Sequence, residues 1–153
     1  MRSKINDFEF TSFIPYRITR LNARLNRQAA TLLERYGDVT LTQWRIILLL
    51  KHEGVDTLSE ISDISGIDKG LLSRNLTGLI DDGLVEMARD EADRRVNRLH
   101  LTASGEALHE RIQPIMTWRQ QRLMRDLTPE QAEAIIAVFD VLDRAAEDLS
   151  FSP

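Results

Sequence analysis

The side chains best suited to binding chemistry lie in one short segment near the middle of the chain. They combine two cations with two small hydroxyl groups, and they are Lys69, Ser73, Arg74 and Thr77. In a helix these positions fall within about two turns and alternate with apolar residues that face the other way. Ammonium, guanidinium and hydroxyl groups can donate hydrogen bonds to phosphates and to base edges in the major groove of DNA. We therefore interpret this segment as a candidate recognition helix.

A second set of cations follows along the chain, at Arg89, Arg94, Arg95 and Arg98. A guanidinium group keeps its charge and fits a narrow minor groove. Asp93 stands two residues before Arg95. We expect its carboxylate to pair with that arginine and fix its direction, so that Asp93 orients and does not bind. This segment predicts a second point of contact with duplex DNA.

Local signals place the first set of cations on the second of two short helices. Thr57 and Glu60 have the spacing of a capping box, so the first helix is expected to start there. Gly66 breaks its apolar pattern, and Asp68 is a suitable cap for the next helix. Apolar residues then recur at helical spacing until Gly83, where the second helix should end.

After this pair of helices the apolar period changes from helical to alternating. Residues 84–88 and 96–101 are typical of short strands, and the arginine-rich segment joins them. Leu99 and Leu101 alternate with polar residues, so one face of the second strand should be buried and the other open to solvent or phosphate. We expect a hairpin, and hence a winged helix-turn-helix.

Several motifs in this order resemble the MarR family of transcriptional regulators. They are Gly83-Leu84-Val85, Asp93-Arg94-Arg95 and Leu101-Thr102, with Thr40-Leu41-Thr42-Gln43-Trp44 before them and Leu127-Thr128-Pro129-Glu130-Gln131 after them. The resemblance covers nearly the whole chain. It implies a mainly α fold with a small β-wing and a sequence-specific DNA-binding regulator, by family habit a repressor. The expected partner is double-stranded DNA with a pseudo-palindromic operator.

The chain length favours a single domain over residues 1–153. Within it we expect a winged-helix lobe over about 38–102, flanked by helical dimerisation regions over about 8–36 and 103–150. The spacing of Thr40 and Gln43 predicts a capped helix that is apolar nearly all round and therefore central. A long helix should start at Thr102, with a kink at Pro114.

The last predicted helix carries an apolar seam that an isolated chain would expose. Its members recur at spacings of three and four: Ile135, Phe139, Leu142, Ala146 and Leu149. Such a seam is typical of intertwined helices. We expect a two-fold homodimer, which would set two recognition helices against half-sites about one DNA turn apart.

The resemblance also implies a cleft for a small anion, often aromatic or phenolic, whose binding loosens the grip on the operator. It would draw on Tyr16, Arg17, Arg20, Tyr36, Trp44 and His52. Each residue also has a simpler interpretation: core packing for the aromatic side chains, a solvated helix face for the arginines, and a favourable helix C-terminus for His52.

Composition limits the other possibilities. The chain is 42% hydrophobic and 29% charged, with a polar start and no apolar run of membrane-spanning length, so we expect a cytoplasmic protein without a membrane partner. The absence of cysteine excludes disulfides, thiol nucleophiles and zinc-thiolate sites, and with them the thiol-based peroxide sensors within the family.

Charge is distributed unevenly, and the segment proposed to read DNA is itself acidic. Residues 1–50 carry a net charge of +4, whereas residues 51–102 and 103–153 each carry -4. Bulk attraction to DNA is therefore weak, and binding must depend on specifically placed contacts.

Catalysis has little support in the sequence. His52, His100 and His109 fall on different predicted elements, and no zinc-protease, nucleophile-elbow or phosphate-loop motif occurs. We expect no enzyme activity, no cofactor and no metal site. Two alternatives to a ligand-responsive regulator stay open: an architectural DNA-binding protein that no ligand affects, and a helical interaction module without DNA binding.

Overall fold

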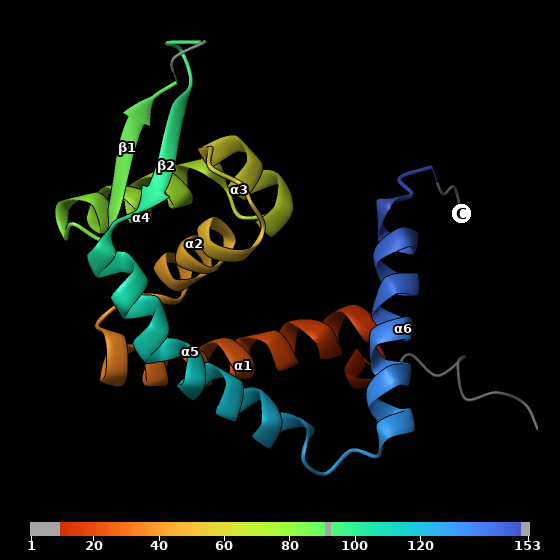
Figure 1. Cartoon of the computed structure of the whole chain (residues 1–153). Helices are drawn as coiled ribbons and strands as arrows, with labels where there is room; N and C mark the ends of the chain where they lie inside the picture. The colour runs from red at the N-terminus through yellow and green to blue at the C-terminus, as the bar shows by residue number, and fades with distance from the viewer. Residues whose placement is uncertain (1–9, 91–92, 151–153) are drawn as a thin grey trace, which may run out of the picture. The chain divides into compact units, whose positions relative to one another are not determined.

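The computed structural model of the chain describes residues 10–90 and 93–150, and these are mainly helical with one two-stranded sheet (Figure 1). This architecture confirms the predicted fold class, a mainly α chain with a small β-wing. The elements in chain order are η2 (Phe10–Ser12), α1 (Ile14–Gly37), α2 (Leu41–His52), α3 (Leu58–Ser65), α4 (Lys69–Asp81), β1 (Val85–Arg89), β2 (Asn97–Leu101), α5 (Ala103–Met124) and α6 (Pro129–Glu147).

The chain forms two compact units, residues 1–115 and 116–153, and α5 begins in the first and ends in the second. All the buried side chains among the described residues belong to the first unit. The core therefore lies in the first unit, which also contains the helix-turn-helix and the hairpin. The sequence predicted one domain whose helical dimerisation regions cover about 8–36 and 103–150.

Helix α2 is the centre of the first unit. Trp44, Ile46 and Ile47 are each at most 2% exposed, and α2 contacts α1, α3, α4 and β2. A helix that is apolar nearly all round can be covered only by neighbours on several sides. The predicted central position of this helix is confirmed.

The helix starts follow the predicted capping boxes. The hydroxyl of Thr57 accepts a hydrogen bond from the Glu60 amide, and the Glu60 carboxylate accepts one from the Thr57 amide. The same reciprocal pair occurs at Thr40 with Gln43 and at Thr128 with Gln131. These boxes satisfy amides that the first turn of a helix leaves free. They fix where α2, α3 and α6 begin.

The two strands are antiparallel, and each begins one residue after its predicted start. β1 begins at Val85 and pairs it with Leu101, because the Leu84 amide donates back to the Leu79 carbonyl and so still belongs to the end of α4. Val85 and Leu99 are each 2% exposed, whereas Met87 is 52% exposed. The hairpin is therefore packed at its base and open beyond it, where it projects from the helices in Figure 1.

The start of α5 is held against the base of the hairpin. The Thr102 hydroxyl donates to the Gly83 carbonyl at 2.6 Å and accepts from the Gly105 amide at 3.1 Å, which confirms the predicted cap. Gly105 itself lies directly against the carbonyl of Leu84, where a Cβ atom would not fit. Pro114 lies inside α5, and the helix continues beyond it to Met124.

The second unit contains the end of α5 and all of α6. Its apolar side chains are open to solvent in the single chain: Ile135, Ile136, Val138, Phe139 and Val141 are 40–62% exposed. Leu149 lies beyond the end of α6 and so falls outside the helical seam predicted for it. No helix among the described residues is both long enough and apolar enough to span a membrane.

Candidate nucleic-acid interface

Helix α4 separates its apolar and polar residues onto two sides. Leu72, Leu76 and Leu79 are buried. The four predicted recognition residues, which we call the recognition face, are exposed: Lys69, Ser73, Arg74 and Thr77. The buried leucines anchor the helix, so its outer side is free to enter a DNA groove.

Two residues of the recognition face have local partners. The Lys69 ammonium donates to the Ser59 hydroxyl at 3.0 Å, which brings the start of α3 beside the start of α4. The Thr77 hydroxyl donates to the Ser73 carbonyl at 3.0 Å, so its oxygen remains as an acceptor. Asp68 caps the helix by accepting from the Leu71 amide.

Asn75 positions α4 and was not singled out by its sequence pattern. Its side-chain amide nitrogen donates to the Leu71 carbonyl, and its oxygen accepts from the Thr40 hydroxyl at 2.9 Å. Thr40 is also the cap of α2, so one side chain connects the recognition helix to the start of the central helix. An Asn within a helix, away from either end, is the signal that could have indicated such a contact.

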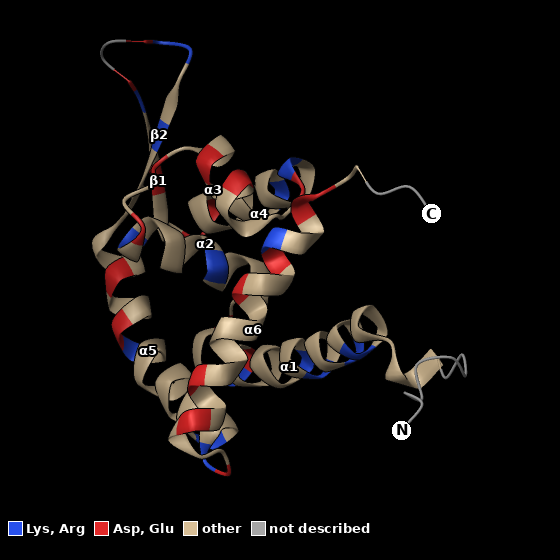
Figure 2. Cartoon of the chain, turned by 90° about the vertical axis from the view of Figure 1, so that its right-hand side faces the viewer, with Lys and Arg blue, Asp and Glu red and all other residues tan. Residues whose placement is uncertain are grey.

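The predicted wing is present, and we use the name for residues 85–101. Arg89, Arg94 and Arg95 are exposed, and Lys and Arg positions at the far end of the wing are visible in Figure 2. The Asp93 carboxylate accepts a hydrogen bond from the Arg95 backbone amide at 2.9 Å. The predicted pairing with the Arg95 guanidinium is not among the ion pairs of the described residues, so Asp93 acts on the turn and only indirectly on the side chain.

Arg98 differs from the other wing arginines because its guanidinium has partners within the chain. Its Nη1 lies 2.6 Å from an Asp56 oxygen, and its Nε lies 2.7 Å from an Asp90 oxygen. Hydrogen bonds to these two carboxylates raise the pKa of Arg98 further above its ordinary value. We therefore remove Arg98 from the predicted DNA contacts, since its charge is already balanced.

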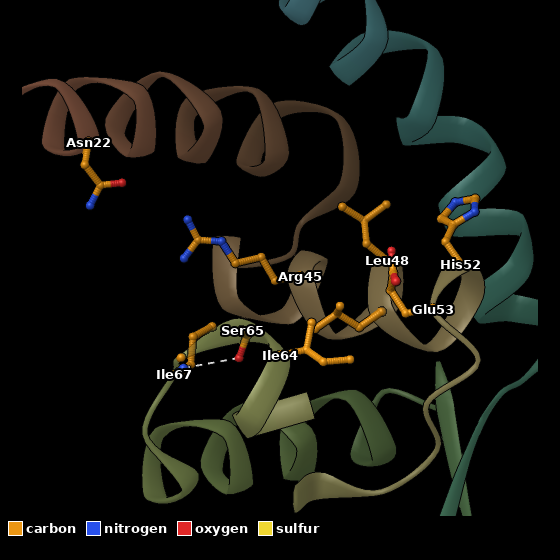
Figure 3. A pocket seen from close by; sticks show the side chains of 10 residues that line it. Asn22, Arg45, Leu48, His52, Glu53, Ile64, Ser65 and Ile67 are labelled. Carbon is orange, nitrogen blue, oxygen red and sulfur yellow. Dashed lines mark hydrogen bonds between the residues drawn. The ribbon is translucent and has the colours of Figure 1, made fainter. Parts of the chain in front are cut away.

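Away from the wing, an open hollow of about 740 Å³ lies beside α2 (Figure 3). Asn22 lines it from α1, Arg45 and His52 line it from α2, and Gly66 lines it from the turn after α3. The Arg45 guanidinium donates to Asn26 at 3.1 Å and points toward the Asn22 side of the hollow. A cation set among leucines and isoleucines is suited to a small anion with an apolar body.

Next to this hollow, two histidines from distant parts of the sequence meet. The Nε2 atoms of His52 and His109 lie 3.0 Å apart, and the His109 ring stacks on Trp44. His109 is 5% exposed, and its Nδ1 has no hydrogen-bond partner among the described residues. Because a buried orphan N–H is rarer than a buried bare acceptor, His109 is best assigned as donating from Nε2 to His52.

Burial lowers the pKa of His109, and electrostatic interactions with His52 and Lys51, which disfavour a charged His109, lower it further. Glu106 and Glu110 act in the opposite direction. The pair therefore favours a neutral His109 in the folded protein.

Comparison with known proteins decides the family. The sequence profile described as MarR family matches residues 37–96. The multiple antibiotic resistance protein MarR of Salmonella typhimurium is 30% identical over 104 residues, covering 66% of this chain and 71% of that protein. The chain belongs to the MarR family.

Two further matches extend over more of this MarR-family chain. HTH-type transcriptional repressor IacR of Pseudomonas putida is 26% identical over 144 residues, covering 94% of this chain and 86% of IacR. A solved structure of an S. aureus MepR-DNA complex has the same fold, with a TM-score of 0.79, 23% identity, and coverage of 87% of this chain and 98% of that one. Membership of the MarR family identifies this chain as a transcriptional regulator and not an enzyme, as the sequence of this chain predicted.

Within the single chain, the six residues predicted for an effector cleft lie at several separate places. Trp44 is in the core, Tyr36 lies under the Arg35 guanidinium, and the Tyr16 ring contacts the Phe10 ring. Arg17 and Arg20 line a separate surface depression on α1. His52 alone of the six lines the larger hollow.

His52 is the only lining residue of that hollow that was predicted for an effector site; sequence reasoning missed the polar side chains of Arg45, Asn22 and Glu53. Arg45 is the one charged residue between Leu41 and Leu50, and it interrupts the apolar run from Trp44 to Leu50. A lone charge in a central helix requires a polar partner or an opening to solvent. That pattern could have indicated Arg45.

Proposed function

We propose that this MarR-family regulator binds duplex DNA sequence-specifically as a homodimer and represses transcription until a small ligand releases it. The observation that carries the proposal is the division of α4, whose leucines are buried while Lys69, Ser73, Arg74 and Thr77 are exposed. Short donors on an anchored helix can reach base edges in a major groove.

The two halves of the interface contribute differently to binding. The recognition face distinguishes sequences, because hydrogen bonds to base edges depend on the base pair. Arg89, Arg94 and Arg95 of the wing add contacts to phosphates or the minor groove that depend little on sequence. Arg98 does not take part in either, because Asp56 and Asp90 already bind its guanidinium.

A homodimer is supported by the apolar surface of α6. Full burial of a side chain such as Phe139 or Ile136 stabilises by roughly 1.5–3 kcal/mol, and α6 has no buried residue within its own chain. A helix with such a face is expected to find a partner, and a second copy supplies an identical face. Two α4 helices would then read half-sites about one DNA turn, roughly 34 Å, apart.

Release by a ligand is supported by the hollow beside α2. Arg45 offers a positive charge, His52 offers a ring nitrogen for hydrogen bonding, and Leu48 and Ile64 offer apolar contact. These groups suit a small anion with an aromatic or other apolar body. The ligand would release DNA only to the extent that it binds more tightly to the conformation that does not fit the operator.

Repression is supported by the relative IacR, which is named a transcriptional repressor. The test is selection from a pool of random duplexes, followed by a screen of small aromatic anions against the enriched sequence. We expect enrichment of a two-fold symmetric sequence and weaker binding with at least one anion. Binding without enrichment would indicate an architectural protein, and no binding would indicate an interaction module; either result would overturn the proposal.

A further inference from the structure

The base of the wing is joined to the helical body by a bridge of three charged side chains. Arg98, on β2, contacts Asp56, in the loop before α3, and Asp90, immediately after β1. We call these three residues the Arg98 bridge. The side chains of Arg98, Asp56 and Asp90 are only 38%, 31% and 18% exposed, respectively, so the pairs are partly shielded from water.

Both acidic residues of the bridge are held in place by further hydrogen bonds, Asp56 through its backbone and Asp90 through its carboxylate. The Asp56 carbonyl accepts from the Leu99 amide at 2.7 Å, and the Asp56 amide donates to Glu60 at the start of α3. The second oxygen of Asp90 accepts from the Asp93 amide at 2.8 Å. One end of the bridge is therefore held by α3 and the other by the turn that carries the wing arginines.

Further hydrogen bonds connect that turn to the backbone of the wing arginines. The Asp93 carboxylate accepts from the Arg95 amide, and the Asp93 carbonyl accepts from the Val96 amide at 2.9 Å. A connected series of hydrogen bonds thus leads from the cap of α3 through Asp56, Arg98 and Asp90 to the backbone of Arg95.

Packing alone gives the outer wing little support. Val85 and Leu99 are buried at its base, but the other four residues of β1 are exposed. An isolated two-stranded hairpin is at best marginally stable in water. The direction of its far end must then depend on polar contacts near its middle.

We propose that Asp56 and Asp90 are positioning residues that hold the wing, through Arg98, in the direction in which Arg94 and Arg95 meet DNA. This inference rests on the proposed DNA-binding function. It assigns a favourable role in DNA binding to two acidic residues, which direct electrostatics would count as unfavourable.

Whether one substitution raises or lowers DNA affinity separates these two views. Removing a carboxylate near a DNA-binding surface normally strengthens binding, because less negative charge faces the phosphates. If Asp56 holds the wing, Asp56→Asn weakens binding instead. The matched control is Asp63→Asn, which removes an exposed carboxylate from α3, outside the bridge.

The experiment measures operator binding by fluorescence anisotropy and amide hydrogen exchange of the free full-length protein. For Asp56→Asn and Asp90→Asn we expect operator affinity to fall about three- to tenfold, the range for loss of a shielded, charge-assisted hydrogen bond. Exchange at the Asp93, Arg95 and Val96 amides should become faster. Asp63→Asn should bind at least as tightly as the wild type and leave wing exchange unchanged.

A double substitution tests whether Arg98 carries the effect. In an Arg98→Gln background, Asp56→Asn should cause no further loss of affinity, because the bridge is already broken. The proposal is overturned if Asp56→Asn behaves like Asp63→Asn, or if its affinity falls while wing exchange stays unchanged. If the wild type binds no operator, the proposed function fails, whereas faster wing exchange in Asp56→Asn would still show that the Arg98 bridge holds the wing.

Discussion

At the scale of single residues, cations with similar sequence contexts have different environments. Arg94 and Arg95 are exposed at the wing, whereas Arg98 is bound by two carboxylates. An exposed guanidinium can exchange water and counterions for a phosphate at little cost, but a paired one must first give up its partners. Location alone therefore does not identify a DNA contact.

Arg94→Ala should weaken operator binding and flatten its dependence on salt. Loss of one phosphate contact lowers the slope of log affinity against log salt by about 0.9 for each subunit. Anisotropy titrations at several salt concentrations measure this slope. Arg94→Lys is the control, since it keeps the charge, and an unchanged slope in Arg94→Ala would show that the wing assignment is wrong.

His109 should make stability depend on pH. Its folded-state pKa lies below the ordinary value of 6.5, so the unfolded chain binds a proton first, and stability falls as pH decreases below about 6.5. The slope for one such group is at most about 1.4 kcal/mol per pH unit. Urea unfolding between pH 7 and 5 should show this loss in the wild type and in His100→Gln but not in His109→Gln. Equal slopes of unfolding free energy against pH in all three proteins would contradict the role given to His109.

At the scale of elements, much of the first unit could be predicted because its signals are local. The capping boxes at Thr57 and Thr40 fix helix starts through contacts three residues apart. Gly66 and Gly83 have φ angles of 65° and 67°, a conformation that favours glycine. Glycine at such positions commonly ends a helix, so these helix ends could be read from the sequence.

Contacts between distant segments could not be predicted in this way. Arg98 meets Asp56 across 42 residues and His52 meets His109 across 57, and no periodicity relates such positions. The predicted effector residues lie apart within the single chain for the same reason, since the rotation of each helix decides which side chains share a hollow. Trp44 is buried because α2 is surrounded by its neighbours.

Gly105→Ala tests the close contact between α5 and the base of the wing. Alanine favours a helix by about 1 kcal/mol over glycine, but here its Cβ would meet the Leu84 carbonyl, and overpacking costs typically 1–3 kcal/mol. We expect a net loss of unfolding free energy by urea denaturation. Ser104→Ala, at an exposed neighbouring position, should be neutral or stabilising; a more stable Gly105→Ala would contradict the described packing.

At the scale of the whole molecule, the two units differ in how stable each can be by itself. The first has a buried core, whereas the described part of the second has only exposed or half-buried side chains. A single helix of 19 residues gains little stability in water without tertiary packing. The proposed homodimer supplies that packing and doubles the DNA-reading surface.

Phe139→Asp should convert the proposed dimer to monomer. Losing the burial of two phenylalanines, one per subunit, at roughly 1.5 kcal/mol or more each raises the dimer dissociation constant about a hundredfold or more. Sedimentation equilibrium over a range of concentrations measures this change. Asp143→Asn on the same helix is the control, and an equally tight Phe139→Asp dimer would show that α6 is not the dimer surface.

The most direct test of DNA reading by α4 is an anisotropy competition with duplex from upstream of the protein's own gene as probe and random duplex as competitor. We predict tight, salt-sensitive wild-type binding that survives the competitor, and Arg74→Ala binding with altered preference among single-base variants of the probe. Equal affinity of the wild type for probe and random duplex would contradict the account, as would an Arg74→Ala variant whose sequence preference is unchanged.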